Sequence, residues 1–98
     1  MSLIEIQQIV ADYFKTQPIL KAWIFGSYAR GEETPLSDVD VLVEYEPEGI
    51  SLLKHAAIIC DLEKLLDKRV DLVQMKLLRT NIKERVIPDL KLIYERSC

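Results

Sequence analysis

The chain has 98 residues, of which 49% are hydrophobic and 30% are charged, and its formal net charge at pH 7 is −3. This length suits one domain, residues 1–98, and leaves little room for a second module. A net negative chain lacks the basic surface on which nonspecific nucleic-acid binding depends. No apolar run approaches the ~20 residues of a membrane span, and the N-terminus lacks the pattern of a signal peptide. We therefore expect a cytoplasmic protein that neither enters membranes nor binds nucleic acid without sequence preference.

Hydrophobic periodicity predicts that helices and strands alternate along the chain. Gln17-Pro18 ends the first helix, and Ser51 is suited to cap the long central one. In chain order we expect a helix over 3–16, a strand over 19–25, a short helix over 28–30, a strand over 38–44, a long helix that begins at 52 and ends near Asp67-Lys68, a strand over 69–73 and a helix over 77–86. For residues 91–95 we expect an edge strand, with a helical tail as the alternative. This order predicts an α+β fold, an α/β sandwich in which helices pack on a small β-sheet.

Cysteine and histidine give no sign of chemistry in this chain. The two cysteines, Cys60 and Cys98, are too few for a disulfide framework. Cys60 lies in the apolar stretch 56–60, so we expect its thiol to be buried. His55 has no motif partner, and we expect it to be a packing or surface residue rather than a catalyst.

The most informative pattern is Gly26-Ser27, ten intervening residues, and then Asp38-Val39-Asp40. Gly26 permits a tight turn at the end of the strand over 19–25, and Ser27 offers a hydroxyl and a backbone N–H to a phosphate. Alternation along the next strand places Asp38 and Asp40 on the same face, with Cα atoms about 6.5–7 Å apart. A phosphate-holding turn beside paired carboxylates predicts nucleotidyl transfer.

Asp71 is a third acidic position, inside the apolar strand Val70-Asp71-Leu72-Val73. A carboxylate in such a strand needs a partner or a metal. If this strand lies beside residues 38–44, Asp71 can join Asp38 and Asp40 on one face. Mutual repulsion would then raise the pKa values of these carboxylates unless cations bind. Oxygen ligands of this kind suit Mg²⁺, and two ions could bridge a triphosphate.

Together these residues resemble the minimal nucleotidyltransferase family, within the DNA polymerase beta-like superfamily. The family signature is Gly-Ser, a ten-residue spacer and Asp-x-Asp, and the segments around it, 25–32 and 37–43, are also similar. Segment 68–73 matches the third acidic position, and the likeness extends over nearly the whole chain. The chain departs from the family at Asp67, where glycine is expected after the helix, which affects stability rather than chemistry.

The resemblance implies a nucleotidyltransferase fold and assigns roles to the site residues. Asp38 and Asp40 would hold the metal ions, with two Mg²⁺ expected. Asp71 would complete one metal site and take the proton of the attacking hydroxyl. Gly26 and Ser27 would hold the β- and γ-phosphates of ATP. Arg30 would meet phosphate or acceptor, although an exposed arginine without a role fits the sequence equally well.

The resemblance also bears on the acceptor. Similar minimal nucleotidyltransferases are paired with small helical HEPN-type toxins, and as antitoxins they transfer AMP to a toxin tyrosine. Protein AMPylation of such a partner is therefore the leading expectation. Two alternatives stay open: a small-molecule nucleotidyltransferase with its acceptor site shared across a homo-oligomer, and a non-catalytic antitoxin that only binds its partner.

Overall fold

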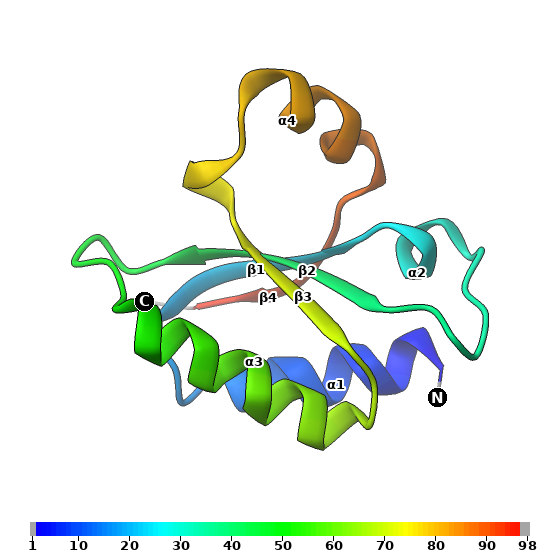
Figure 1. Cartoon of the computed structure of the whole chain (residues 1–98), viewed down its shortest axis with the longest axis horizontal. Helices are drawn as coiled ribbons and strands as arrows, with labels where there is room; N and C mark the ends of the chain where they lie inside the picture. Colours follow the sequence, from blue (N-terminus) through cyan, green and yellow to red (C-terminus); the bar gives the residue numbers. More distant parts are fainter. Residues whose placement is uncertain (1, 97–98) are drawn as a thin grey trace.

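The computed structural model describes residues 2–96, apart from the side chain of Ile82. Cys98 lies outside this range. Within residues 2–96, four strands and four α-helices alternate, with two short 3₁₀ helices flanking the last α-helix (Figure 1). In order, they are α1 (Leu3–Phe14), β1 (Ile19–Phe25), α2 (Ser27–Arg30), β2 (Val39–Tyr45), α3 (Leu52–Leu66), β3 (Val70–Gln74), η1 (Met75–Leu77), α4 (Thr80–Val86), η2 (Ile87–Asp89) and β4 (Lys91–Glu95).

The strands form one mixed sheet in the order β3-β2-β1-β4. β1 lies between β2 and β4 and is antiparallel to both, whereas β2 and β3 are parallel. The parallel pair follows from its connection, because the chain must return along the sheet through α3 before β3 can begin. This topology brings β3, the strand that carries Asp71, directly beside β2, the strand that carries Asp40.

One face of the sheet forms the core. Helices α1 and α3 cover this face, while α4 lies on the other side of the sheet and α2 lies beyond the end of β1 (Figure 1). On β2 the alternate residues Val39, Val41, Val43 and Tyr45 are buried in the core cluster. Leu42 is also fully buried but points away from that cluster, as the strand period of two requires. Sheet alternation thus leaves Asp40 on the face opposite α1 and α3.

The predicted order of elements is confirmed, with shifts at several ends. The first helix ends at Phe14 instead of residue 16, and β2 begins at Val39, one residue later than expected, so that Asp38 precedes the strand. The helix expected over 77–86 begins only at Thr80, because residues 75–77 form a 3₁₀ turn. Its end agrees with the expectation, since α4 stops at Val86, two residues before Pro88.

Local capping explains where the two long helices begin and end. Ser2 and Glu5 form a reciprocal capping box at α1, and the Ser51 side chain accepts from the Lys54 amide at α3. Asp67 ends α3 in the left-handed conformation, with φ 51° and ψ 42°. No helix of the described chain is both long and apolar enough to cross a bilayer.

The expectation for Cys60 was wrong. Cys60 is exposed on the outer side of α3, where Ala56 and Ala57 are exposed as well. The buried positions of α3 are Ile58, Leu62 and Leu66, which recur every four residues. The apolar run 56–60 is therefore wider than the face that α3 buries, and the run alone did not show on which side Cys60 would lie.

Candidate active site

The sheet gathers the predicted acidic residues at the end of β1. Asp40 pairs in register with Phe25, the last residue of β1, on one side and with Asp71 of β3 on the other. Paired residues in adjacent strands point to the same face. Asp40 and Asp71 therefore lie side by side on the face opposite the main core, next to the turn that begins at Gly26. The conditional expectation that the two strands are neighbours is confirmed.

Asp38 reaches the same region from the loop before β2. The amide of Val39 donates to the carbonyl oxygen of Arg69 at 2.9 Å, which fixes the start of β2 against the segment leading into β3. Inside the loop, the Ser37 hydroxyl accepts from the Thr34 amide at 2.8 Å. The side chain of Asp38 is exposed. Its position is set by these loop contacts and not by strand alternation.

The electrostatics of Asp40 reflect this crowding. Burial raises the pKa of the Asp40 carboxyl above its usual value, and the nearby negative charges of Asp71 and Asp38 raise it further. The positive charge of Arg30 acts in the opposite direction and lowers the Asp40 pKa. The ionised form of Asp40 is therefore disfavoured until a cation comes close.

Gly26 and Ser27 form the turn beside these carboxylates. Gly26 has φ 74° and ψ −150°, a backbone conformation that is essentially restricted to glycine. Its carbonyl oxygen accepts from the Arg30 amide at 3.1 Å, and the Ser27 carbonyl accepts from the Glu32 amide at 2.9 Å. The turn thus leads straight into α2 and holds Ser27 at the end of β1, half-buried and near Asp40.

Arg30 lies at the end of α2 and is bound by two carboxylates. Its Nε donates to Glu32 Oε2 at 3.3 Å, and its Nη1 donates to Asp89 Oδ2 at 3.2 Å. The positive charge of Arg30 also lowers the pKa of Asp40, so Arg30 acts electrostatically on the acidic cluster while its guanidinium is bound to these two partners. Arg30 is exposed, and these contacts do not decide between an arginine without a role and one that meets phosphate or acceptor, so its role toward phosphate stays a prediction.

The donor set suits Mg²⁺ better than a softer metal. Asp38, Asp40 and Asp71 offer only carboxylate oxygens, which magnesium prefers. Within residues 2–96, however, no group of three or more His, Cys, Asp and Glu side chains is arranged so that it could hold a metal ion. Mg²⁺ usually takes one or two carboxylates and completes its shell with water and substrate phosphate, so the Asp40–Asp71 pair fits this ion without a closed protein cage.

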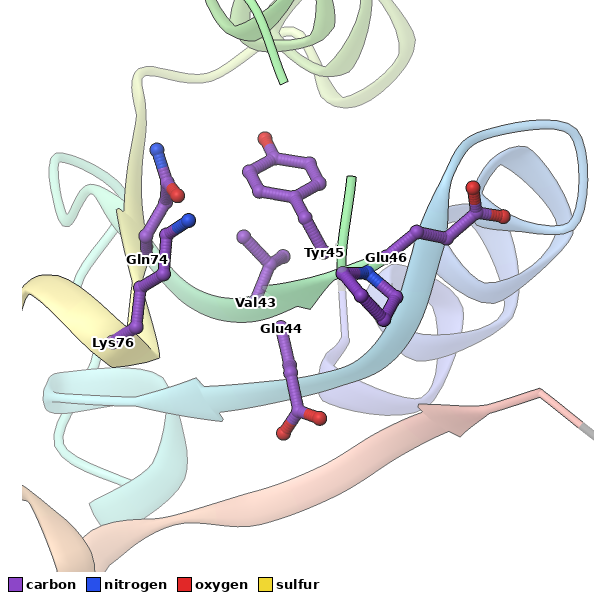
Figure 2. Close-up of a pocket in the computed structure, with 7 residues that line it drawn as sticks. Val43, Glu44, Tyr45, Glu46, Gln74 and Lys76 are labelled. Atoms are coloured by element: carbon purple, nitrogen blue, oxygen red, sulfur yellow. The ribbon is translucent and has the colours of Figure 1, made fainter. Parts of the chain in front are cut away.

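A separate cavity of about 130 Å³ lies at the other end of β2 and is lined by Val43, Glu44, Tyr45, Glu46, Pro47, Gln74 and Lys76. Figure 2 shows that Glu44 points away from the side on which the Tyr45 ring stands. Ligand sites commonly enclose about 300–1,000 Å³. This small cavity is therefore no match for a nucleoside triphosphate, and it lies several residues along β2 from Asp40.

His55 joins α3 to two strands near that cavity. Its Nδ1 lies 2.8 Å from the Tyr45 hydroxyl, and its Nε2 lies 3.2 Å from the carbonyl oxygen of Leu72. Since the carbonyl can only accept, Nε2 carries the proton and Nδ1 accepts from Tyr45. Both ring nitrogens of His55 are used in hydrogen bonds between α3 and the sheet, which fits the structural role expected for this residue.

Sequence reasoning missed Asp89 as a neighbour of the site. Asp89 is 59 positions from its partner Arg30 and belongs to no motif. Only the placement of β4 beside β1 brings the two together, and the sequence does not state strand order. No local signal could have identified this residue.

Comparison with known proteins identifies the family of this chain. The family described as polymerase beta, nucleotidyltransferase, matches residues 6–98. A protein of Methanocaldococcus jannaschii, named as a candidate protein adenylyltransferase, is 36% identical over 87 residues, which cover 89% of this chain and 92% of the relative. The protein adenylyltransferase MntA of Thermococcus cleftensis is 48% identical over 64 residues, covering 65% of this chain and 64% of MntA.

Solved structures share the fold. A candidate minimal nucleotidyltransferase superposes with a TM-score of 0.79 at 35% identity, over 93% of this chain and 95% of the other. A toxin–antitoxin structure with AMP-PNP gives a TM-score of 0.79 at 20% identity, over 93% and 74%. A complex of a tri-AMPylated HEPN toxin with an MNT antitoxin, from Shewanella oneidensis, gives 0.66 at 20%, over 92% and 73%. The chain belongs to the polymerase beta nucleotidyltransferase family, has the fold of the minimal nucleotidyltransferases and is an enzyme of that class.

Proposed function

We propose that this protein transfers AMP from ATP, with Mg²⁺, to a tyrosine hydroxyl of a HEPN-type toxin and thereby acts as its antitoxin. The observation that carries the chemistry is the register of Asp40 with Asp71 beside the Gly26 turn. The names of the relatives support AMP as the transferred group and a protein as the acceptor. The same proposal places the protein in the cytoplasm, where ATP is available. It also takes residues 1–98 to form one domain.

Each site residue has a part in the proposed reaction. Asp38, Asp40 and Asp71 would hold two Mg²⁺ ions, which supply charge neutralisation on the triphosphate. Gly26 and Ser27 contact the β- and γ-phosphates through the turn, where the Ser27 hydroxyl can donate to an oxygen. The acceptor oxygen bonds to the α-phosphorus as the bond to the pyrophosphate oxygen breaks, and Asp71 takes the hydroxyl proton. Positioning and electrostatics then account for most of the rate.

The acceptor is proposed from what the relatives are named to do, whereas the chemistry is proposed from the site itself. The structure with an AMPylated HEPN toxin shares 20% identity with this chain, so its likeness extends to the fold. A relative at 48% identity carries the name protein adenylyltransferase. A hydroxyl on a protein partner fits both.

The test is AMP transfer in the purified system. The protein is incubated with Mg²⁺, ATP labelled at the α-phosphate and a purified HEPN-type toxin, for which the product of the adjacent gene is the first candidate. The Asp38→Asn/Asp40→Asn double variant is run in parallel, and Asp12→Asn, an exposed residue of α1, serves as the control. We expect the mass of the partner to rise by AMP units with the wild type and the control, and not with the double variant.

Two outcomes would redirect the assignment. Tight association with the partner without Mg-ATP binding would favour the non-catalytic antitoxin. Transfer to an added small-molecule hydroxyl, with an untouched protein partner, would favour the small-molecule enzyme. Partner modification that survives in the double variant would contradict the proposed site.

A further inference from the structure

The segment that leads into the fourth strand brings an acidic residue, Asp89 of η2, to the same end of the sheet. β4 runs antiparallel to β1, and Lys91 at its start pairs with Ile24, one residue before the end of β1. Moving backward from Lys91 therefore leads past the end of β1. Asp89 is two residues before Lys91, so it lies beside the turn at Gly26. It approaches β1 from the side of β4, whereas Asp40 approaches from the side of β2.

Asp89 contacts the guanidinium of Arg30, whose positive charge also lowers the pKa of Asp40. The Arg30 Nη1 lies 3.2 Å from Asp89 Oδ2, and Glu32 binds Nε at 3.3 Å. Among the described residues, 2–96, carboxylate partners are found for Nε and Nη1 of Arg30. No carboxylate partner is found there for its Nη2. Two carboxylates therefore fix the plane of the guanidinium while one nitrogen keeps both of its N–H donors for a further acceptor.

The pair has little value as a stabilising contact. The side chain of Arg30 is 43% exposed and that of Asp89 is 31% exposed. Ion pairs this open to solvent contribute little to the free energy of folding. An arginine held in one orientation loses less side-chain entropy when it then binds a phosphate in its planar, two-donor geometry. Preorganisation for an anion explains the pair better than stability does.

We propose that Asp89 is a positioning residue that, together with Glu32, holds Arg30 so that Nη2 is presented to the triphosphate. The inference rests on the proposed function and adds to it a residue outside the family signature. It also links the segment from α4 to η2 with nucleotide binding, because Asp89 ends η2. Loss of Asp89 should weaken the binding of ATP and leave the reacting groups in place.

A double-mutant cycle tests the proposal. Mg-ATP binding is measured by calorimetry for the wild type, Arg30→Ala, Asp89→Asn and the double variant, with Asp12→Asn as the control for loss of an exposed paired carboxylate. We expect Arg30→Ala to raise the Kd about tenfold and Asp89→Asn about threefold. The double variant should match Arg30→Ala within about twofold, because Asp89 acts through Arg30.

Transfer kinetics separate positioning from chemistry. With the HEPN-type partner as acceptor, Asp89→Asn should raise the KM for ATP and leave kcat unchanged, and its midpoint of thermal unfolding should stay within about 2 °C of the wild type. Unchanged or tighter ATP binding in Asp89→Asn, or additive losses in the double variant, would overturn the proposal. If the wild type binds Mg-ATP but transfers no AMP, the proposed function fails while the binding cycle still tests Asp89.

Discussion

Asp40 occupies the space into which a side chain at Gly26 would project. A Cβ atom built on Gly26 would lie 2.2 Å from Asp40 Oδ2, closer than real Cβ contacts come, and 3.1 Å from Asp40 Cγ, which is tighter than most of them. Gly26 also has φ 74° and ψ −150°, which other residues adopt only under strain. The glycine of the Gly-Ser pair is thus required twice, once by the backbone and once by the carboxylate that lies against it.

Gly26→Ala should therefore damage the site more than the fold. The new methyl group must displace the Asp40 carboxylate or the turn, and a shift of about 1 Å at reacting groups can cost about 100-fold in rate. We expect AMP transfer to fall by at least about 100-fold and the free energy of unfolding to fall by about 1–3 kcal/mol. Labelled-ATP transfer and urea unfolding measure the two effects.

Gly49→Ala is the matched control. Gly49 also has a positive φ, 80°, but the nearest atom to a Cβ placed on it would be Lys76 Nζ, at 4.0 Å. This substitution carries the backbone cost without the collision with a carboxylate. A comparable loss of transfer in Gly49→Ala would show that general destabilisation, and not the Asp40 contact, explains the effect at Gly26.

Asp40 should lower stability at neutral pH. Its folded-state pKa is raised, chiefly by burial and then by the charges of Asp71 and Asp38, so the folded state holds this proton more tightly than the unfolded state. The stabilisation is present below the unfolded pKa and is lost as pH rises through the folded pKa. Asp40→Asn, which resembles the protonated form, should be more stable than the wild type at pH 7 by up to about 1 kcal/mol, after allowance for solvent screening.

The difference between Asp40→Asn and the wild type should shrink as pH falls from 7 to 4, measured by urea unfolding at each pH. Adding Mg²⁺ at pH 7 should also narrow it, because a cation beside the ionised pair stabilises only the wild type. A variant that is less stable than the wild type at pH 7 without metal would contradict the repulsion described here.

The bounds of helices and strands could be predicted from the sequence where hydrophobic periodicity distinguishes one type of element from another. They were predicted less well where it does not. The bounds of β1 at 19–25 agree with the prediction, and α3 begins at Leu52 and ends at Leu66, directly before the predicted end near Asp67. Apolar spacing and the flanking turn or cap residues point to the same ends in both elements. The last helix begins three residues later than predicted, since Leu77 and Leu78 extend an apolar pattern into a segment that forms a 3₁₀ turn first. Sequence spacing does not distinguish these two helix types over a single turn.

The candidate site divides in the same way. The spacing of Gly26, Asp38 and Asp40 is local, so the motif could be found without a structure. The prediction that Asp71 lies beside Asp40 held only if their two strands are neighbours, which the sequence does not state. The parallel pairing of β2 with β3 meets this condition. Asp89 depends on a second long-range pairing, between β1 and β4, and carries no motif of its own.

His55 should matter for stability and not for transfer. Its ring accepts from Tyr45 at 2.8 Å and donates to the Leu72 carbonyl at 3.2 Å, so His55→Ala leaves polar groups of two buried residues without this partner. We expect the free energy of unfolding to fall by about 1–3 kcal/mol. Tyr45→Phe, which removes only one of the two bonds, should cost less. A loss of AMP transfer in folded His55→Ala would give this histidine a role in the chemistry that its contacts do not indicate.

Asp67 offers a stabilising substitution. It ends α3 with φ 51° and ψ 42°, a conformation that costs a residue with a Cβ more than it costs glycine, and its negative charge faces the negative end of the helix dipole. Asp67→Gly removes both penalties but adds entropy to the unfolded chain, so we expect a net gain of about 0.5–1 kcal/mol in urea unfolding. Asp67→Ala also removes the charge, but it keeps a Cβ atom, and alanine tolerates this conformation less well than aspartate does. Asp67→Ala should therefore be less stable than Asp67→Gly. Equal stability of the two variants would mean that the backbone at Asp67 is not strained, and that only the helix dipole disfavours the wild-type residue.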